Sequence, residues 1–226
     1  MKNYYSRRLS ALNLVKCYEL ATPRIKEYLD AELDFALSYI SNNSAVLDLG
    51  CGYGRTLPAI ALKANSVTGI DISSANISLA KELLSDLSNC VLKKMNAANL
   101  RFSPDNFDVT LCLQNGISAF NIDPKIIITQ SIRVTKPGGI ILFSTYSEKF
   151  WNHRLDWFIL QSRAGLLGEI DFSKTQNGII LCKDGFKSAT FSVNDFRILA
   201  KDISNIKISF KEVNRSSLFF IINKLL

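Results

Sequence analysis

Residues 45–55 read Ala-Val-Leu-Asp-Leu-Gly-Cys-Gly-Tyr-Gly-Arg, an apolar run that ends in three glycines at alternate positions. Apolar β-forming residues followed by glycines, with a helical pattern beyond them, predict a strand, a tight turn and a helix. Gly50, Gly52 and Gly54 permit a sharp turn and let a ligand approach main-chain N–H groups closely. Asp48 places a carboxylate at the carboxyl end of this strand, where open α/β sheets bind their ligands.

A second acid, Asp71, follows the apolar run at residues 67–70 and stands about twenty residues past the glycines, where a ribose-binding carboxylate is expected. The spacing does not match the dinucleotide fingerprint Gly-x-Gly-x-x-Gly, because Arg55 occupies the third glycine position. The chain also has no Gly-Lys-Ser/Thr sequence, so the phosphate loop of an NTPase is excluded. The pattern indicates a nucleotide-like ligand of another kind.

Leu-Asp-Leu-Gly-Cys-Gly-Tyr-Gly resembles motif I of the class I S-adenosylmethionine-dependent methyltransferases. The resemblance covers residues 45–145 in motifs and the whole chain in topology. It implies an α/β fold with a doubly wound, mostly parallel seven-stranded sheet that ends in an antiparallel hairpin, and S-adenosylmethionine as the cofactor. The alternative is a glycine turn in an unrelated α/β protein.

The resemblance implies nine cofactor-binding residues: Asp48, Gly50, Gly52, Tyr53, Asp71, Ile72, Asn96, Ala97 and Gln114. Asp71 is expected to accept hydrogen bonds from both ribose hydroxyls, and Ile72 to pack on the adenine. Asn96 stands where the family has the aspartate of Gly-Asp-Ala-x-x-Leu, so its amide oxygen would be a neutral and weaker acceptor.

Methyl transfer is an in-line displacement at an activated sulfonium methyl, so proximity and alignment can supply most of the acceleration. A general base is needed only when the acceptor must lose a proton. The catalytic candidates are His153, Tyr146 and Asn115, with Tyr4 and Tyr5 as further possibilities. His153 is the chain's only histidine, and a structural role is its alternative. Residues 114–116, Gln-Asn-Gly, differ from the Asn/Asp-Pro-Pro-Tyr/Phe of amino-methylating DNA and protein enzymes, which disfavours an exocyclic amine as acceptor.

Composition bounds the remaining possibilities. The 226 residues, 47% hydrophobic and 21% charged, are typical of a globular chain. No apolar stretch approaches the roughly eighteen residues of a membrane helix, and the N-terminus lacks the apolar region of a signal peptide. Five cysteines without Cys-x-x-Cys spacing suggest neither a disulfide framework nor a metal site. A cytoplasmic location without a membrane partner is therefore expected.

The strand and helix patterns predict one domain over residues 1–226. Its expected parts are an N-terminal helical lid (1–44), a cofactor-binding core (45–147), a substrate-side insertion (148–190) and a closing helix and strand pair (191–226). Helices are expected at Ser6–Leu20, Thr56–Lys63 and Glu148–Ala164, among others. A strand is expected at Ile140–Thr145 and an antiparallel hairpin within Gly168–Phe186, turning at Asn177-Gly178.

The sequence thus predicts S-adenosylmethionine-dependent methyl transfer to a small-molecule acceptor. The insertion, with both tryptophans and His153, would line the acceptor pocket. The net charge of +7 suggests the alternative of an RNA or protein methyltransferase, but the basic residues are scattered, which makes a nucleic acid the less favoured partner. A nucleotide-binding module without catalysis is the third possibility. Nothing in the sequence indicates an oligomeric state.

Overall fold

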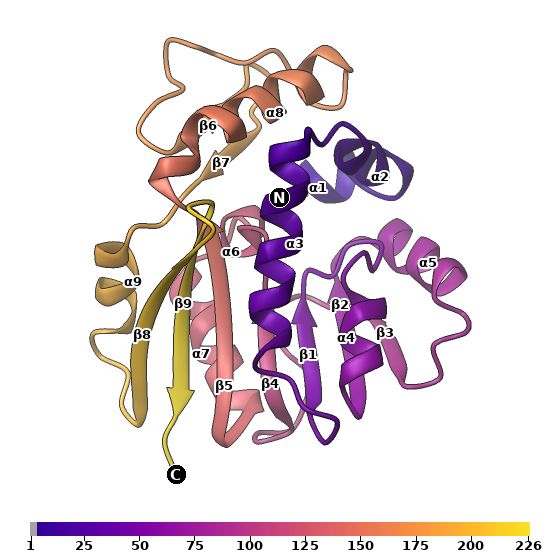
Figure 1. Ribbon diagram of the computed structural model, residues 1–226, viewed down its shortest axis with the longest axis vertical. Helices are drawn as coiled ribbons and strands as arrows, with labels where there is room; N and C mark the ends of the chain where they lie inside the picture. Colours follow the sequence, from indigo (N-terminus) through magenta and orange to yellow (C-terminus); the bar gives the residue numbers. More distant parts are fainter. Residues whose placement is uncertain (1–3) are drawn as a thin grey trace.

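A seven-stranded sheet forms the centre of the computed structural model, which describes residues 4–226 (Figure 1). The strands lie in the order β3 (Cys90–Lys94), β2 (Ser66–Asp71), β1 (Ala45–Leu49), β4 (Phe107–Cys112), β5 (Thr135–Tyr146), β9 (Ser217–Lys224) and β8 (Ile206–Val213). Strand β9 runs antiparallel to both of its neighbours, and the other pairs are parallel. The predicted mostly parallel sheet with a C-terminal antiparallel pair is confirmed.

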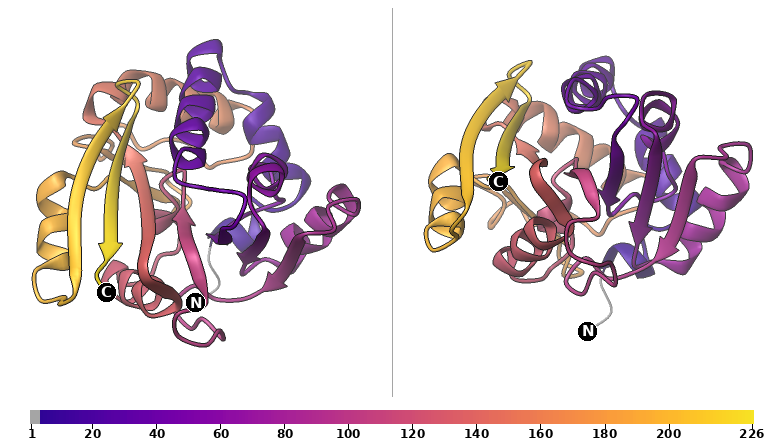
Figure 2. Two further views of the ribbon diagram at one scale, coloured as in Figure 1. Left: turned by 60° about the horizontal axis from the view of Figure 1, so that its bottom comes forward. Right: turned by 90° about the horizontal axis from the view of Figure 1, so that it is seen from below.

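Helices cover both faces of the sheet (Figure 2). On one face, α3 (Pro23–Leu37), α4 (Leu57–Lys63) and α5 (Ser74–Leu83) pack on side chains such as Val46 and Val67. On the other, α7 (Pro124–Val134) and α9 (Val193–Ala200) pack on side chains such as Leu47 and Phe143. Successive strand residues point to opposite faces, which is why these strands are apolar throughout rather than alternating.

The remaining elements gather beyond the carboxyl ends of the parallel strands, at the top of Figure 1. They are α1 (Tyr4–Arg7), α2 (Leu12–Glu19), α6 (Gly116–Ala119), the 3₁₀ turn η1 (Glu148–Phe150), α8 (Trp151–Arg163), and the strands β6 (Ile179–Leu181) and β7 (Lys187–Ala189). The N-terminal helices and the segment from η1 to β7 share one aromatic-rich core. Within residues 4–226, every helix is too short or too polar to cross a bilayer.

Two elements differ from the sequence prediction in their bounds. The helix expected over Ser6–Leu20 is two helices, because Ala11 adopts a left-handed φ of 50° that interrupts the helical hydrogen bonds. Strand β5 begins at Thr135 rather than Ile140. Thr135 pairs with Phe107 and Ile140 pairs with Val109, so the intervening turn residues bulge out of a strand that continues on both sides.

The hairpin of β6 and β7 exists, but its turn lies elsewhere than predicted. The strands pair from Ile179 with Ala189 to Leu181 with Lys187, and Gly185 in the connection has a φ of 92°. The Asn177-Gly178 pair instead turns the chain just before β6, closing a bridge between Gln176 and Ile179. Asn177-Gly178 and Gly185 are all residues that tolerate positive φ, so the residue types alone do not show which of the two turns joins β6 to β7.

Candidate functional site

The glycine turn joins β1 to α4 and lies against the end of β2. The N–H groups of Gly50 and Cys51 both donate to the Ile70 carbonyl, at 2.8 and 2.9 Å. Gly52 has a φ of 56°, and a Cβ added there would lie 2.9 Å from Cδ2 of Leu14 on α2. The backbone conformation therefore favours glycine, and any side chain at this position would have to displace the Leu14 side chain.

One cavity at the carboxyl ends of β1, β2 and β4 is lined by all nine residues that the sequence predicts to bind the cofactor. Asp71 lies at its rim beside the glycine turn. The Asp71 carboxylate accepts hydrogen bonds from the N–H of Gly52 at 3.1 Å and of Ser73 at 2.7 Å. A carboxylate has about four acceptor positions, so lone pairs remain for a ligand.

Asp48 is buried at the floor of the same cavity, with an exposed fraction of 3%. Its carboxylate accepts a 3.3 Å hydrogen bond from the Thr56 hydroxyl. Burial raises the pKa of Asp48 to about 7, while the Thr56 hydrogen bond and the charge of Arg55 oppose the rise. A cationic group close to Asp48 would therefore stabilise the ionised form of this buried carboxylate.

Arg55 is the basic residue of this cavity wall. Its guanidinium lies over the ring of Tyr18, 4.9 Å from the ring centre. Within the described residues, its buried Nε and Nη2 atoms have no hydrogen-bond partner. Buried N–H groups of a cation without acceptors are costly, so they indicate a place for an anionic group of a ligand.

The far end of the cavity is formed by Ile72, Asn96 and Ala97. Ile72 is 42% exposed, so an apolar surface is available there for a flat ring. The side-chain oxygen of Asn96 accepts a 2.9 Å hydrogen bond from the N–H of Ala98. This local turn occupies part of the acceptor capacity that the sequence analysis assigned to an adenine amino group.

Gln114 and Asn115 follow β4 and both adopt left-handed φ angles, 54° and 58°. Gln114 lines the cavity, where its side-chain oxygen accepts a hydrogen bond from the Tyr18 hydroxyl. Asn115 is buried and does not line it: its amide donates to the Ala189 carbonyl at 2.9 Å and accepts from the Thr145 hydroxyl at 2.8 Å. Asn115 therefore ties the β4 end to β5 and β7, and this geometry gives no support to a catalytic role.

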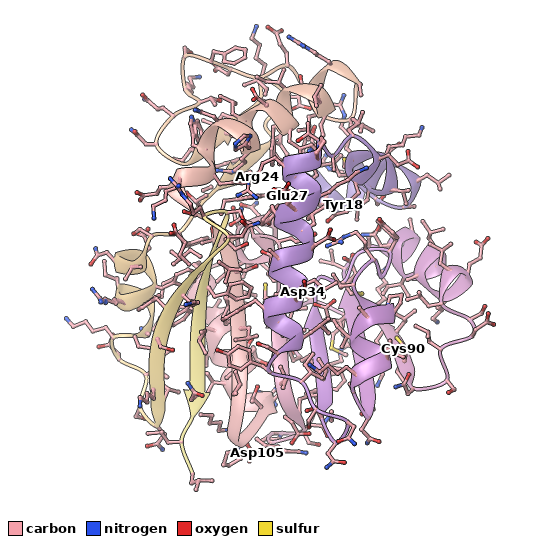
Figure 3. All side chains as sticks on the ribbon, viewed as in Figure 1. Tyr18, Arg24, Glu27, Asp34, Cys90 and Asp105 are labelled. Carbon is pink, nitrogen blue, oxygen red and sulfur yellow. The ribbon has the colours of Figure 1, made fainter. Side chains whose placement is uncertain are left out.

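A second cavity adjoins the first and shares five of its lining residues: Tyr5, Leu9, Leu14, Tyr18 and Gln114. Its other walls come from α3, β5, α8 and the connection before β7, and they include Tyr28, Tyr146, Trp157, Phe158 and Phe186. Figure 3 shows Tyr18 beside the upper end of α3, at the opposite end of the sheet from Asp105. The N-terminal helices thus contribute to both cavities.

The N-terminal segment is anchored on either side of these cavities. The N–H of Ala11 donates a 2.6 Å hydrogen bond to the side chain of Asn76 at the start of α5. Tyr4 and Arg8 both bond to Asp184 in the β6–β7 turn, at 2.6 and 2.5 Å. Tyr4 therefore points away from the cavities, whereas Tyr5 lines both of them.

Two of the predicted catalytic side chains, Tyr146 and His153, lie in different surroundings. Tyr146 lines the second cavity, with its ring centre 5.2 Å from that of Tyr28 and 4.7 Å from the guanidinium of Arg154. His153 is exposed on α8 and lines neither cavity. The buried face of α8 carries Arg154 and Trp157, and helical periodicity leaves His153 at the margin of that face. Helix α8 therefore contributes Trp157 and Phe158 to the wall of the second cavity, but not His153.

Comparisons with known proteins identify the domain and its fold. The family model described as a methyltransferase domain matches residues 40–165. The chain belongs to the methyltransferase domain family. Its seven-stranded sheet and its solved relatives place it among the class I members of this family, whose cofactor is S-adenosylmethionine.

Among curated relatives, the ubiquinone biosynthesis O-methyltransferase of Pseudomonas syringae pv. tomato is 38% identical over 106 residues, 46% of this chain and 44% of the relative. The match thus spans less than half the length of the curated relative. A solved structure of a SAM-dependent methyltransferase from Methanosarcina mazei is 26% identical, with a TM-score of 0.61 and coverage of 84% of this chain and 96% of that one. N-methyltransferase NodS from Bradyrhizobium japonicum, solved with S-adenosylhomocysteine, shares the fold at 15% identity, TM-score 0.59, and coverage of 90% and 88%.

The sequence analysis missed Tyr18 and Arg55, which line the first cavity, and Glu32, which lines neither cavity but accepts a hydrogen bond from Gln114. Glu32 stands among several acids, a composition typical of a solvated helix face, but it is only 1% exposed. A signal was present, because Ile25, Tyr28, Leu29, Glu32 and Ala36 recur at helical spacing and form the buried stripe of α3. An acid within such a stripe marks a buried carboxylate that needs partners.

Proposed function

We propose that this methyltransferase transfers a methyl group from S-adenosylmethionine to a hydroxyl group of a small aromatic acceptor bound in the second cavity. The observation that carries the proposal is the set of lining residues shared by the two cavities. A donor in one cavity and an acceptor in the other meet beside Gln114 and Tyr18. Such juxtaposition is the main requirement for an in-line displacement.

The residues of the first cavity fit the groups of the cofactor. Arg55, with its buried N–H groups lacking acceptors within residues 4–226, would hold the methionine carboxylate. Asp48 would interact with the ammonium, and Asp71 with the ribose hydroxyls. Gly52 and Leu14 both line this cavity, and a Cβ at position 52 would lie 2.9 Å from Cδ2 of Leu14, so a side chain there would crowd Leu14.

The other predicted cofactor residues receive their roles by position. Gly50 and Tyr53 would border the methionine chain beside the glycine turn, and Gln114 would lie nearest the transferred methyl group. Ile72, Asn96 and Ala97 would enclose the adenine at the far end of the cavity. Bound there, the cofactor supplies a methyl group already activated by its sulfonium.

The walls of the second cavity indicate the class of acceptor. Six aromatic side chains line it besides Tyr5: Tyr18, Tyr28, Tyr146, Trp157, Phe158 and Phe186. Aromatic walls favour a flat aromatic ligand, which packs against them edge-on or offset, and they exclude water from the reacting groups. The O-methyltransferase activity named for the curated relatives favours a hydroxyl group over an amine.

The basic residues and the cysteines bear on the partner and the location that we propose. The ion pairs of the described residues include lysines and arginines at widely separated places, such as Arg24, Lys125 and Lys183, which favours a small molecule over a nucleic acid. All five cysteines are free, which supports a reducing, cytoplasmic environment.

The test is an assay with methyl-labelled S-adenosylmethionine and four candidate acceptors: phenol, 4-nitrophenol, total RNA and a protein extract. Mass analysis of the products is expected to show the label as a phenyl methyl ether. Gly52→Val, in which we expect cofactor binding to be weakened, serves as the control. Label found in RNA or protein, with neither phenol methylated, would contradict the proposed acceptor class.

A further inference from the structure

Glu32 is a buried carboxylate on α3 that the proposed mechanism has not used. It accepts hydrogen bonds from the Tyr28 hydroxyl at 3.3 Å, the Gln114 N–H at 3.2 Å and the Ser217 hydroxyl at 3.5 Å. The Ser144 hydroxyl also lies close enough to lower its pKa. Among residues 4–226, its carboxylate takes part in none of the ion pairs. A carboxylate held by neutral donors away from water is a strong proton acceptor when ionised.

The titratable and charged groups that act on Glu32 come from several elements: Tyr28 of α3, Arg55 of the glycine turn, Tyr146 of β5 and Cys112 of β4. Burial raises the pKa of Glu32 to about 7, whereas its hydrogen bonds and the charge of Arg55 oppose this rise. A carboxyl group that titrates near neutral pH is suited to accept a proton and release it again in each cycle.

Tyr28 connects Glu32 with the second cavity. Its side chain lines that cavity, and its hydroxyl donates to Glu32. Burial and the charge of Glu32 raise the pKa of Tyr28, so its phenol stays protonated and can only pass a proton on. Glu32 lines neither cavity, which makes Tyr28 its route to the ligand space.

We propose that Glu32 accepts, through the Tyr28 hydroxyl, the proton that a hydroxyl acceptor loses during methyl transfer. The acceptor oxygen forms a bond to the methyl carbon while the bond between that carbon and sulfur breaks, and its electron pair stays on sulfur. The acceptor proton moves to the Tyr28 oxygen as the Tyr28 proton moves to Glu32. The inference rests on the proposed function, because it requires an acceptor with an ionisable hydroxyl in the second cavity.

The proposal makes the two phenols respond differently to loss of Glu32. Phenol is a weak acid and must lose its proton during attack. 4-Nitrophenol is a much stronger acid and is mostly ionised in water at pH 8, so it needs little help. Glu32→Gln keeps the shape and an acceptor oxygen for Gln114 and Tyr28 but cannot take a proton.

The experiment measures kcat/KM for both phenols at pH 8 in the wild type, Glu32→Gln, Tyr28→Phe and the double variant. Both single variants are expected to lower the value for phenol by about 10²-fold or more, with a far smaller loss for 4-nitrophenol. The double variant is expected to be no worse than the single ones, because the two residues act in one relay. The phenol rate of the wild type should rise with pH through about 7, and Glu32→Gln should lack that rise.

Glu27→Gln is the matched control, since Glu27 lies on the same helix with a 63% exposed side chain. Calorimetry with S-adenosylhomocysteine checks that each variant is folded and keeps its cofactor site. Equal losses for the two phenols, or an unchanged pH profile in Glu32→Gln, would overturn the relay while leaving the proposed function intact. A wild-type protein that methylates neither phenol would overturn the acceptor class and the relay with it.

Discussion

The N–H of Gln114 donates a 3.2 Å hydrogen bond to the carboxylate of Glu32, which ties the end of β4 to helix α3. Gln114 and the following Asn115 both have left-handed φ angles, a conformation that costs non-glycine residues of order 1–3 kcal/mol. Glu32 and Tyr18 hold Gln114, while Thr145 holds Asn115. The strained turn is thereby fixed at the junction of the two cavities.

Arg55→Ala is expected to weaken S-adenosylmethionine binding by about 10- to 100-fold, because hydrogen bonds to charged groups contribute about 1.5–3 kcal/mol. Adenosine, which has no carboxylate, should bind both proteins equally. Calorimetry with the two ligands makes the comparison. Arg101→Ala is the control, since Arg101 is exposed and lies outside the cavity. An equal loss for adenosine would show that Arg55 does not hold the carboxylate.

Asp71→Ala is expected to weaken binding of S-adenosylmethionine and adenosine alike, by about 1–3 kcal/mol, because the ribose hydroxyls lose a charged acceptor. Titration calorimetry measures it. Asp86→Ala provides the control, as this exposed acid follows α5 and does not line the cavity. Unchanged affinity in folded Asp71→Ala protein would refute the ribose assignment.

Gly52→Ala tests the space at the glycine turn. The new Cβ would lie 2.9 Å from Cδ2 of Leu14, so we expect weaker cofactor binding in addition to a loss of stability. Gly165→Ala is a matched control, because Gly165 also has a positive φ but has no atom within 4 Å of an added Cβ. The double variant Gly52→Ala with Leu14→Ala should recover part of the loss. If Gly165→Ala destabilises the fold as much, conformation alone explains the requirement for glycine.

The pH dependence of stability follows from the two buried carboxyl groups. Folding raises the pKa of Glu32 and of Asp48 to about 7, above their ordinary values of 4.5 and 3.8. The folded state then binds more protons than the unfolded state between about pH 4 and 7, so the free energy of unfolding should fall as the pH rises through this range. Urea unfolding at pH 5 and pH 8 measures the decrease.

Glu32→Gln and Asp48→Asn should each reduce that decrease, by about 1.4 kcal/mol for every pKa unit removed. Glu27→Gln, on the exposed side of α3, should leave it unchanged. If the free energy of unfolding falls by the same amount between pH 5 and pH 8 in all three variants, groups other than Glu32 and Asp48 cause the fall.

His153→Ala is expected to leave turnover within about twofold of the wild type, because the side chain is exposed and lines neither cavity. Trp157→Ala removes a wall of the second cavity and should raise KM for phenol while cofactor affinity is retained. Steady-state kinetics on both variants give the contrast. A loss of 10²-fold or more in His153→Ala would restore the histidine as a general base.

The sequence by itself determined the fold class and the cofactor side of the site. Strand periodicity, the glycine turn and the spacing from Asp48 to Asp71 are local features, and the parallel pairing of Leu49 with Ile70 brings them together wherever this fold forms. The nine predicted residues accordingly line one cavity.

Tertiary structure alone decided the acceptor side. Whether Glu32 faces solvent or the interior depends on which stripe of α3 packs under β5 and α8, and its acidic neighbours along the chain resemble an ordinary solvated face. His153 and Trp157 are four residues apart, a spacing that normally places two side chains on the same face of a helix. Here Trp157 is buried, whereas His153 lies at the edge of the buried face and is exposed. Contacts between segments far apart in the chain selected these orientations from those that the local helical patterns left open.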